Sequence, residues 1–213
     1  MNAKKLSFLL LILVAVACTN RSTSSEQDEM RHWNNVLQQI NALLLENKAR
    51  QTLDLAKQTL PEILESAEKN GTTDTLIYYA RKIFNACGNN YINTKQYKDG
   101  IDYMDSIGNH PLIREHCPHE LLSFKAGLNQ LYGNNPEAVR LAEDYLQLPV
   151  CTSANDFIRQ AEIISGVYMY SGNNLPKAIQ ILEKAIDVYR KGGNFPNMLR
   201  IMSRLGIYYH LSG

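Results

Sequence analysis

The sequence predicts an all-α fold in which antiparallel helix pairs stack into a solenoid. The first observation is a set of glycines at intervals of 39, 39 and 40 residues: Gly88, Gly127, Gly166 and Gly206. The second is a set of small residues 11 or 12 positions after the first three glycines: Gly100, Ala138 and Ala178. The third is apolar spacing typical of helices, with no competing strand alternation. A fixed period of this length indicates stacked repeats.

The small residues are expected to lie where helices cross closely. Glycine inside a helix costs about 1 kcal/mol relative to alanine, so a periodic glycine indicates a packing requirement. The alternative is that Gly-Asn-Asn, which begins at Gly88, Gly133 and Gly172, only marks turns. One period before Gly133 stands Thr94, not Gly88. The register therefore predicts that Gly133 and Gly172 end helices, with a left-handed cap at Gly172, whereas Gly88 lies inside one.

The apolar spacing predicts nine helices in chain order. They cover about residues 33–44, 53–70, 74–93, 96–107, 118–133, 136–149, 153–172, 176–192 and 196–213. Pro61 is expected to kink the second of them, and residues 109–111 are expected to form a connector. Pro118, Pro136 and Pro176 each suit the first turn of a helix.

Several residues give the repeat a family resemblance. Leu205-Gly206 followed by Tyr209 resembles the first helix of a tetratricopeptide repeat, whose pattern spreads Leu-Gly, Tyr, Ala, Phe and Pro over about 34 residues. Similar partial patterns are Cys87-Gly88, Tyr91, Tyr97, Gly100 and Met104, and then Gly166, Ala178, Leu182 and Ala185. The departures are a longer period of about 39–40 residues, no repeated Trp, and Gly100 in place of Ala. The resemblance implies a right-handed α-solenoid over residues 28–213, with an incomplete last repeat.

The N-terminus predicts export and lipidation. Lys4 and Lys5 precede an apolar run that is too short to span a bilayer, and Ala15-Val16-Ala17 resembles an export cleavage site. Cys18 follows directly, as in a bacterial lipobox. We expect residues 1–17 to be a signal peptide and residues 18–27 a disordered tether, acylated at Cys18 with chains such as palmitate. The alternative is plain secretion with a free Cys18 thiol. Either way the expected location is the bacterial cell envelope, facing the periplasm or the surface.

Charge and motifs exclude several classes of function. Without Lys4 and Lys5, 20 basic residues face 21 acidic ones, so no basic stripe for nucleic acid is expected. The sequence has no nucleophile elbow, H-E-x-x-H, P-loop or dinucleotide fingerprint. We therefore predict a protein without enzymatic activity and without a cofactor.

The histidines and cysteines predict no metal site. The spacing of His110, His116, Cys117 and His119 matches no zinc pattern. Cys117 and Cys151 are expected at the same end of neighbouring repeats, where a disulfide is possible if a loop closes the distance between them. The alternative is that both remain thiols.

The resemblance implies a concave groove lined by the first helix of each pair. The glycine register assigns to it Lys82, Asn85, Asn89, Asn93, Leu121, Phe124, Leu128, Tyr132, Gln160, Ile163, Val167 and Tyr170. Asn85, Asn89 and Asn93 are four apart and form one stripe of amides, which could bind the backbone of an extended peptide. The alternative is an ordinary solvated face.

The resulting functional expectation is a non-catalytic, membrane-anchored scaffold for a protein or peptide partner in the envelope. A second hypothesis is signal transduction, because the chain resembles the extracytoplasmic sensor half of Bacteroidetes histidine kinases and related regulators. Nutrient or glycan capture is the least favoured, since Trp33 is the single Trp and lies outside the groove.

Overall fold

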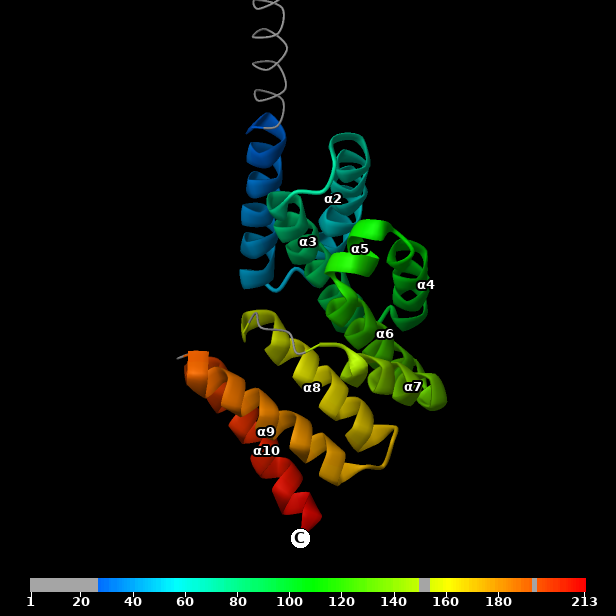
Figure 1. Ribbon diagram of the computed structural model, residues 1–213, viewed down its shortest axis with the longest axis vertical. Coiled ribbons are helices and arrows are strands. Elements are labelled where there is room, and N and C mark those ends of the chain that lie inside the picture. Colours follow the sequence, from blue (N-terminus) through cyan, green and yellow to red (C-terminus); the bar gives the residue numbers. More distant parts are fainter. Residues whose placement is uncertain (1–26, 150–153, 193–194) are drawn as a thin grey trace, which may run out of the picture.

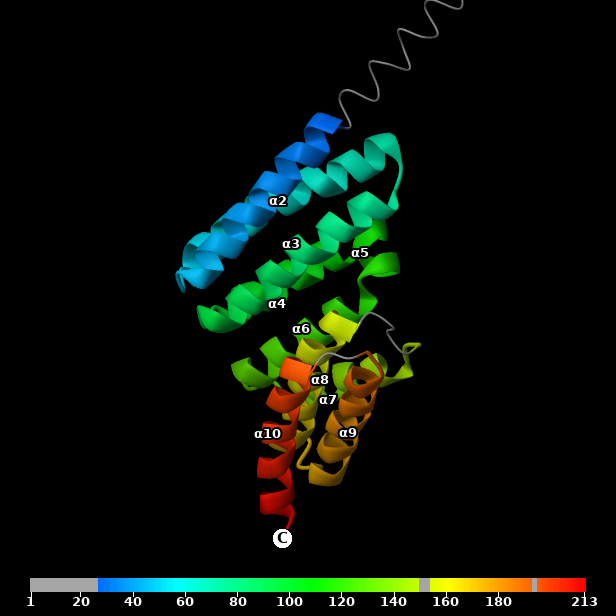
Figure 2. The ribbon, with the colours of Figure 1, turned by 90° about the vertical axis from the view of Figure 1, so that its left-hand side faces the viewer.

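A computed structural model describes residues 27–149, 154–192 and 195–213, and in this part of the chain every regular element is a helix. It confirms the predicted all-α solenoid of stacked helix pairs. The two ends of the described chain lie at opposite ends of the long axis (Figures 1 and 2). The predicted signal peptide and Cys18 lie outside the described residues.

The helices follow one another as antiparallel neighbours. They are an N-terminal helix over residues 27–45, α2 (Ala49–Asn70), α3 (Asp74–Asn93), α4 (Tyr97–Gly108), α5 (Pro111–His116), α6 (Pro118–Tyr132), α7 (Asn135–Gln147), α8 (Ala154–Tyr170), α9 (Leu175–Gly192) and α10 (Phe195–Ser212). The pairs are the N-terminal helix with α2, α3 with α4, α6 with α7, and α8 with α9, while α10 packs mainly on α9. None of the described helices is long and apolar enough to cross a membrane.

Three of the pairs turn in the same way. Each has one residue with a left-handed backbone after its first helix: Asn47, Lys95 and Gly133, with φ of 56°, 59° and 95°. The next residue donates its N–H to the carbonyl five positions back, as Lys48 does to Leu43 at 2.9 Å. This bond is the one that defines a Schellman helix end. The predicted helix end at Gly133 is thus confirmed, and its cap is left-handed.

The fourth turn corrects the prediction for Gly172. The left-handed residue is Asn173, with φ of 43°, and Asn174 donates its N–H to the Tyr168 carbonyl six positions back. The turn therefore holds one residue more than the others. A Cβ at Gly172 would meet Tyr168 atoms no closer than 3.4 Å, so neither space nor backbone conformation requires glycine there.

The predicted connector at residues 109–111 is also corrected, because it leads into the extra short helix α5. Nδ1 of His110 accepts the N–H of Leu112 at 3.2 Å and caps this helix. Leu112 and Ile113 are buried, and α5 contacts α3, α4 and α6. The additional turn therefore fills the core at one edge of the second pair.

The repeat glycines differ in what surrounds them. A Cβ at Gly88 would lie 2.4 Å from the Phe124 ring, one at Gly127 would lie 2.7 Å from Ile163, and one at Gly100 would lie 3.0 Å from Tyr91. Gly88 and Gly127 thus make room for the first helix of the following pair rather than for the partner in their own pair. At Gly166 the nearest atom would be 3.9 Å away, and at Gly206 nothing lies within 4 Å. Ala138 and Ala178 are fully buried.

Candidate binding groove

A cleft of about 700 Å³ lies between the N-terminal helix, α3 and the start of α10. Leu37, Ile40 and Leu44 of the N-terminal helix form its apolar wall. The α3 wall is polar, and Arg200 of α10 completes the lining from the other end of the chain. The curvature of the solenoid thus brings segments more than a hundred residues apart to one cleft.

The predicted amide stripe lies on the α3 wall. Lys82, Asn85, Asn89 and Asn93 all line the cleft. The Asn89 side chain donates to the Asn85 carbonyl at 2.9 Å. Within the described residues, no side-chain hydrogen bond engages the amides of Asn85 and Asn93. The structure therefore places these two amides where they can donate to and accept from a bound chain.

A buried asparagine lies behind this stripe. Asn90 is fully buried and also lines the cleft, and its side chain donates to the Ala86 carbonyl at 2.8 Å. Its side-chain oxygen finds no hydrogen-bond partner in the described part of the chain. Buried acceptors usually have a hydrogen-bond partner. This oxygen can therefore accept a hydrogen bond from a bound ligand.

Charged groups lie at two sides of the cleft. The Lys82 ammonium lies 5.8 Å from the centre of the Tyr78 ring, and Tyr78 is about half exposed. Arg200 donates to the carboxylate of Glu162 at 2.9 Å, and Glu162 is only 4% exposed. The Arg200 charge is therefore largely balanced by a buried carboxylate.

A smaller cavity of about 200 Å³ extends the inner surface along α6, α8 and α10. Ile163 and Tyr170, both predicted groove residues, line it together with Gly166 and Arg204. Tyr132 is 55% exposed and is not part of either cavity. Arg204 donates to the Glu162 backbone carbonyl at 3.0 Å, so α10 is tied to α8 between the two cavities.

Other predicted groove residues are corrected to core positions. Phe124 and Leu128 are fully buried, Val167 is fully buried, and Gln160 is 1% exposed. The reason is the packing of Gly88: the Phe124 ring fills the space above it, so this face of α6 is covered by α3. Leu121 is partly buried against the same core. Gln130 and Leu131, which line the smaller cavity instead, were not predicted.

The cysteines lie apart from the groove. Cys87 and Cys117 are fully buried, and burial raises the pKa of the Cys87 thiol to about 12. Cys151 lies outside the described residues, so its predicted bridge to Cys117 stays a prediction. Among the described residues, no three His, Cys, Asp or Glu side chains gather as metal ligands would.

Comparisons with known proteins give one kind of similarity. No family model matches the sequence, and no curated protein matches it. Among solved structures, the chain is similar to the nearly identical TPR-like repeats of a kinesin light chain from Podosopora anserina, with 9% identity and a TM-score of 0.48. That alignment covers 86% of this chain and 97% of the other. A single-residue variant of the same protein matches to the same extent. At this identity the similarity concerns the type of fold alone.

Proposed function

We propose that this protein is a non-catalytic scaffold that binds an extended peptide segment of a partner protein in the α3 cleft. The observation that carries the proposal is the amide stripe of Asn85, Asn89 and Asn93 along one wall of a cleft of about 700 Å³. TPR-like repeat folds typically act as scaffolds for protein partners, and their concave surfaces are formed by stacked helices.

The two walls suit different parts of a peptide. Asparagine amides carry both donors and acceptors, so they can pair with the N–H and C=O groups of an extended backbone. The opposite wall, with Leu37, Ile40 and Leu44, can hold apolar side chains that alternate with those groups.

The experiment is a selection of peptides from a random phage-displayed library on residues 27–213. The affinity of each selected peptide is then measured by fluorescence anisotropy. The double variant Asn85→Ala/Asn93→Ala should weaken binding, because each lost hydrogen bond contributes about 0.5–1.5 kcal/mol. Asn109→Ala is the matched control, since Asn109 lies at the end of α4 and its amide donates to Asp105. Peptides that bind the double variant as tightly as the wild type would disprove the assignment of the groove.

We also propose that the scaffold is held at a bacterial envelope membrane through a lipidated Cys18. The support is the sequence alone: a charged and then apolar leader, an A-x-A-like site, and a cysteine directly after it. Cys18→Ala should move the protein from the membrane fraction to the soluble fraction, because the variant lacks the residue that would carry the acyl chains of the anchor. Wild-type protein that partitions into the aqueous phase in a detergent phase separation would rule out the anchor.

A further inference from the structure

A row of apolar side chains crosses the first helices of successive pairs on the inner surface of the solenoid. Three of its members each stand four residues after the repeat glycine of their helix: Ile92 on α3, Leu131 on α6 and Tyr170 on α8. All three line the cavity of about 200 Å³. Leu131 is 41% exposed and Tyr170 is 69% exposed, whereas Ile92 is partly buried. The row is therefore accessible to a ligand.

Leu44 continues this row on the N-terminal helix. It stands three residues before the left-handed Asn47, as Ile92 stands three before Lys95. Leu44 is 42% exposed and lines the α3 cleft. The apolar row thus consists of Leu44, Ile92, Leu131 and Tyr170. It leads from the α3 cleft into the smaller cavity, across helices that follow one another along the solenoid (Figures 1 and 2).

The floor of the smaller cavity is open at Gly166. In the two preceding repeats, the glycine is covered by a large apolar side chain from the next stacked helix. The equivalent residue, three before the next repeat glycine, is the exposed Ser203 on α10. The atom nearest to a Cβ at Gly166 is instead Oε1 of Gln130, at 3.9 Å. A side chain of a ligand can therefore lie over Gly166 as Phe124 lies over Gly88.

The spacing of the apolar row selects the conformation of the ligand. Helices that pack directly, as α3 does with α6 and α6 with α8, have axes about 8–10 Å apart. A polyproline II chain has three residues per turn and rises about 3.1 Å per residue. Every third side chain therefore lies on the same side, about 9 Å further along. In a β-strand, residues on the same side are only about 7 Å apart, so a polyproline II segment matches the row better.

A helix of a partner protein is a less suitable occupant of this surface. Its backbone N–H and C=O groups are bonded within the helix, so they cannot pair with the amides of Asn85 and Asn93 in the cleft beside Leu44. A helix with its side chains is also about 10–12 Å across, which is wide for a cavity of about 200 Å³. A polyproline II chain has no internal hydrogen bonds, so its backbone remains available to these amides.

We propose that the partner segment is a polyproline II peptide of about ten residues with a large apolar residue at every third position. Its apolar side chains contact the four residues of the apolar row in turn. This inference rests on the proposed function, because it concerns the same peptide that enters the α3 cleft. It adds the conformation and the sequence pattern that the peptide must have.

The probe is a fluorescein-labelled peptide of four Leu-Pro-Gln repeats, in which proline favours polyproline II and leucine recurs at every third position. Its binding to residues 27–213 is measured by fluorescence anisotropy. The control peptide has the same composition with its leucines at alternate positions. It should bind about tenfold more weakly, because its leucines cannot all face the row. Equal affinity of the two peptides, or no binding of the probe, would overturn the inference.

Substitutions in the apolar row provide the second test. Leu131→Ser and Tyr170→Ser should each weaken binding of the probe about tenfold, because each removes apolar area that the peptide covers. Both side chains are exposed, so the melting temperature should stay that of the wild type. Leu146→Ser is the matched control, since Leu146 is 37% exposed on α7 and lines neither the cleft nor the smaller cavity. Its affinity for the probe should be unchanged.

Peptides selected by phage display separate this inference from the proposed function. Selected peptides that lose affinity with Asn85→Ala/Asn93→Ala and also with Leu131→Ser would support both. Peptides that respond to the asparagine variant alone would leave the α3 cleft as the binding site and overturn the role of the apolar row. Peptides that respond to neither variant would contradict both proposals.

Discussion

Gly88→Ala is the substitution whose effect the structure determines most directly. The new Cβ would lie 2.4 Å from two ring atoms of Phe124. That ring is fully buried and is packed edge-on against Phe84, with centroids 6.2 Å apart, so it has little room to move. Overpacking a core costs about 1–3 kcal/mol, and alanine recovers about 1 kcal/mol of helix preference. We expect a net destabilisation of about 1–2 kcal/mol, near the upper part of the range because the contact is so short.

Gly206→Ala is the matched substitution with the opposite expected sign. Gly206 is at the equivalent repeat position inside α10, but nothing lies within 4 Å of its Cβ. Only the helix preference then changes, and we expect stabilisation of up to about 1 kcal/mol. For a domain of this size, about 1 kcal/mol shifts the melting temperature by about 2–4 °C. Thermal melts of both variants therefore measure the difference between a covered and an open glycine.

Two further measurements locate the effect. Because repeat proteins can unfold unit by unit, hydrogen exchange should show faster opening of α3 and α6 in Gly88→Ala, with α10 unchanged. Combining Gly88→Ala with Phe124→Leu should cost less than the sum of the two single changes, since the smaller side chain relieves the overlap. A neutral Gly88→Ala together with a destabilising Gly206→Ala would refute the packing argument.

Other outcomes follow from a buried ion pair and from the cysteines. Arg81→Met should destabilise the fold by about 3–5 kcal/mol, because Glu120 is 2% exposed and loses the guanidinium that lies 3.2 Å from its carboxylate. Glu120→Gln in the same chain should recover part of this loss, and urea titrations of both variants measure it. Cys87 should resist iodoacetamide in the folded protein at pH 8, since burial raises its pKa to about 12. As the pH rises above 9, the thiol ionises first in the unfolded chain, and its contribution to stability should decline. In a chain acylated at Cys18, a disulfide between Cys117 and Cys151 should leave only Cys87 reactive after denaturation without reductant, whereas three reactive thiols would exclude the bridge.

Much of the fold could be read from the sequence, because proline and glycine act locally. Pro118 begins α6, and Pro136 and Pro176 each stand one residue inside α7 and α9, as their fixed φ favours. The short helix α5 could not be found in this way. Its two buried residues, Leu112 and Ile113, are too few to define a period, and its cap is a histidine rather than one of the usual capping residues.

The sequence predicted only one wall of the α3 cleft. Spacing by four residues is sufficient to place Asn85, Asn89 and Asn93 on one helix face. It does not reveal which distant segment lies opposite, and here the opposing lining includes Arg200. The misplacement of Phe124 has the same origin. A glycine register shows where a helix is approached closely, but it does not show whether the approaching helix belongs to the same pair or to the next.

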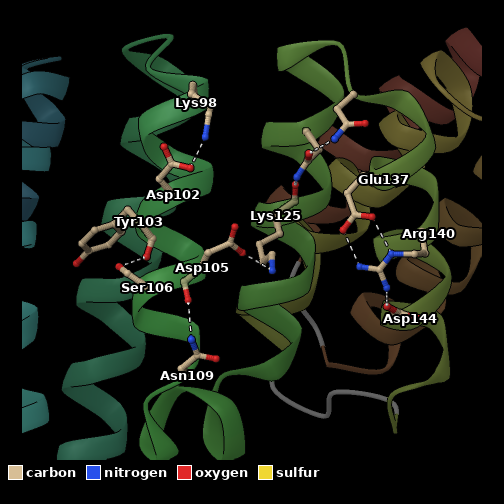
Figure 3. A network of polar contacts seen from close by, with 12 residues as sticks. Lys98, Asp102, Tyr103, Asp105, Ser106, Asn109, Lys125, Glu137, Arg140 and Asp144 are labelled. Atoms are coloured by element: carbon tan, nitrogen blue, oxygen red, sulfur yellow. Dashed lines mark hydrogen bonds and ion pairs between the residues drawn. The ribbon is translucent and has the colours of Figure 1, made fainter.

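Two ion pairs between successive helix pairs illustrate how a weak interaction can still specify an assembly: Asp105 of α4 contacts Lys125 of α6 (Figure 3), and Glu143 of α7 contacts Lys177 of α9. Partly exposed pairs such as Asp105 with Lys125 contribute only about 0–1 kcal/mol each, so they explain little of the stability of the stack. Their direction is more informative, because each of these acids contacts a lysine of the following pair. Together with the contacts that Gly88 makes with Phe124 and Gly127 with Ile163, these ion pairs fix the side and the register at which the next helix pair stacks.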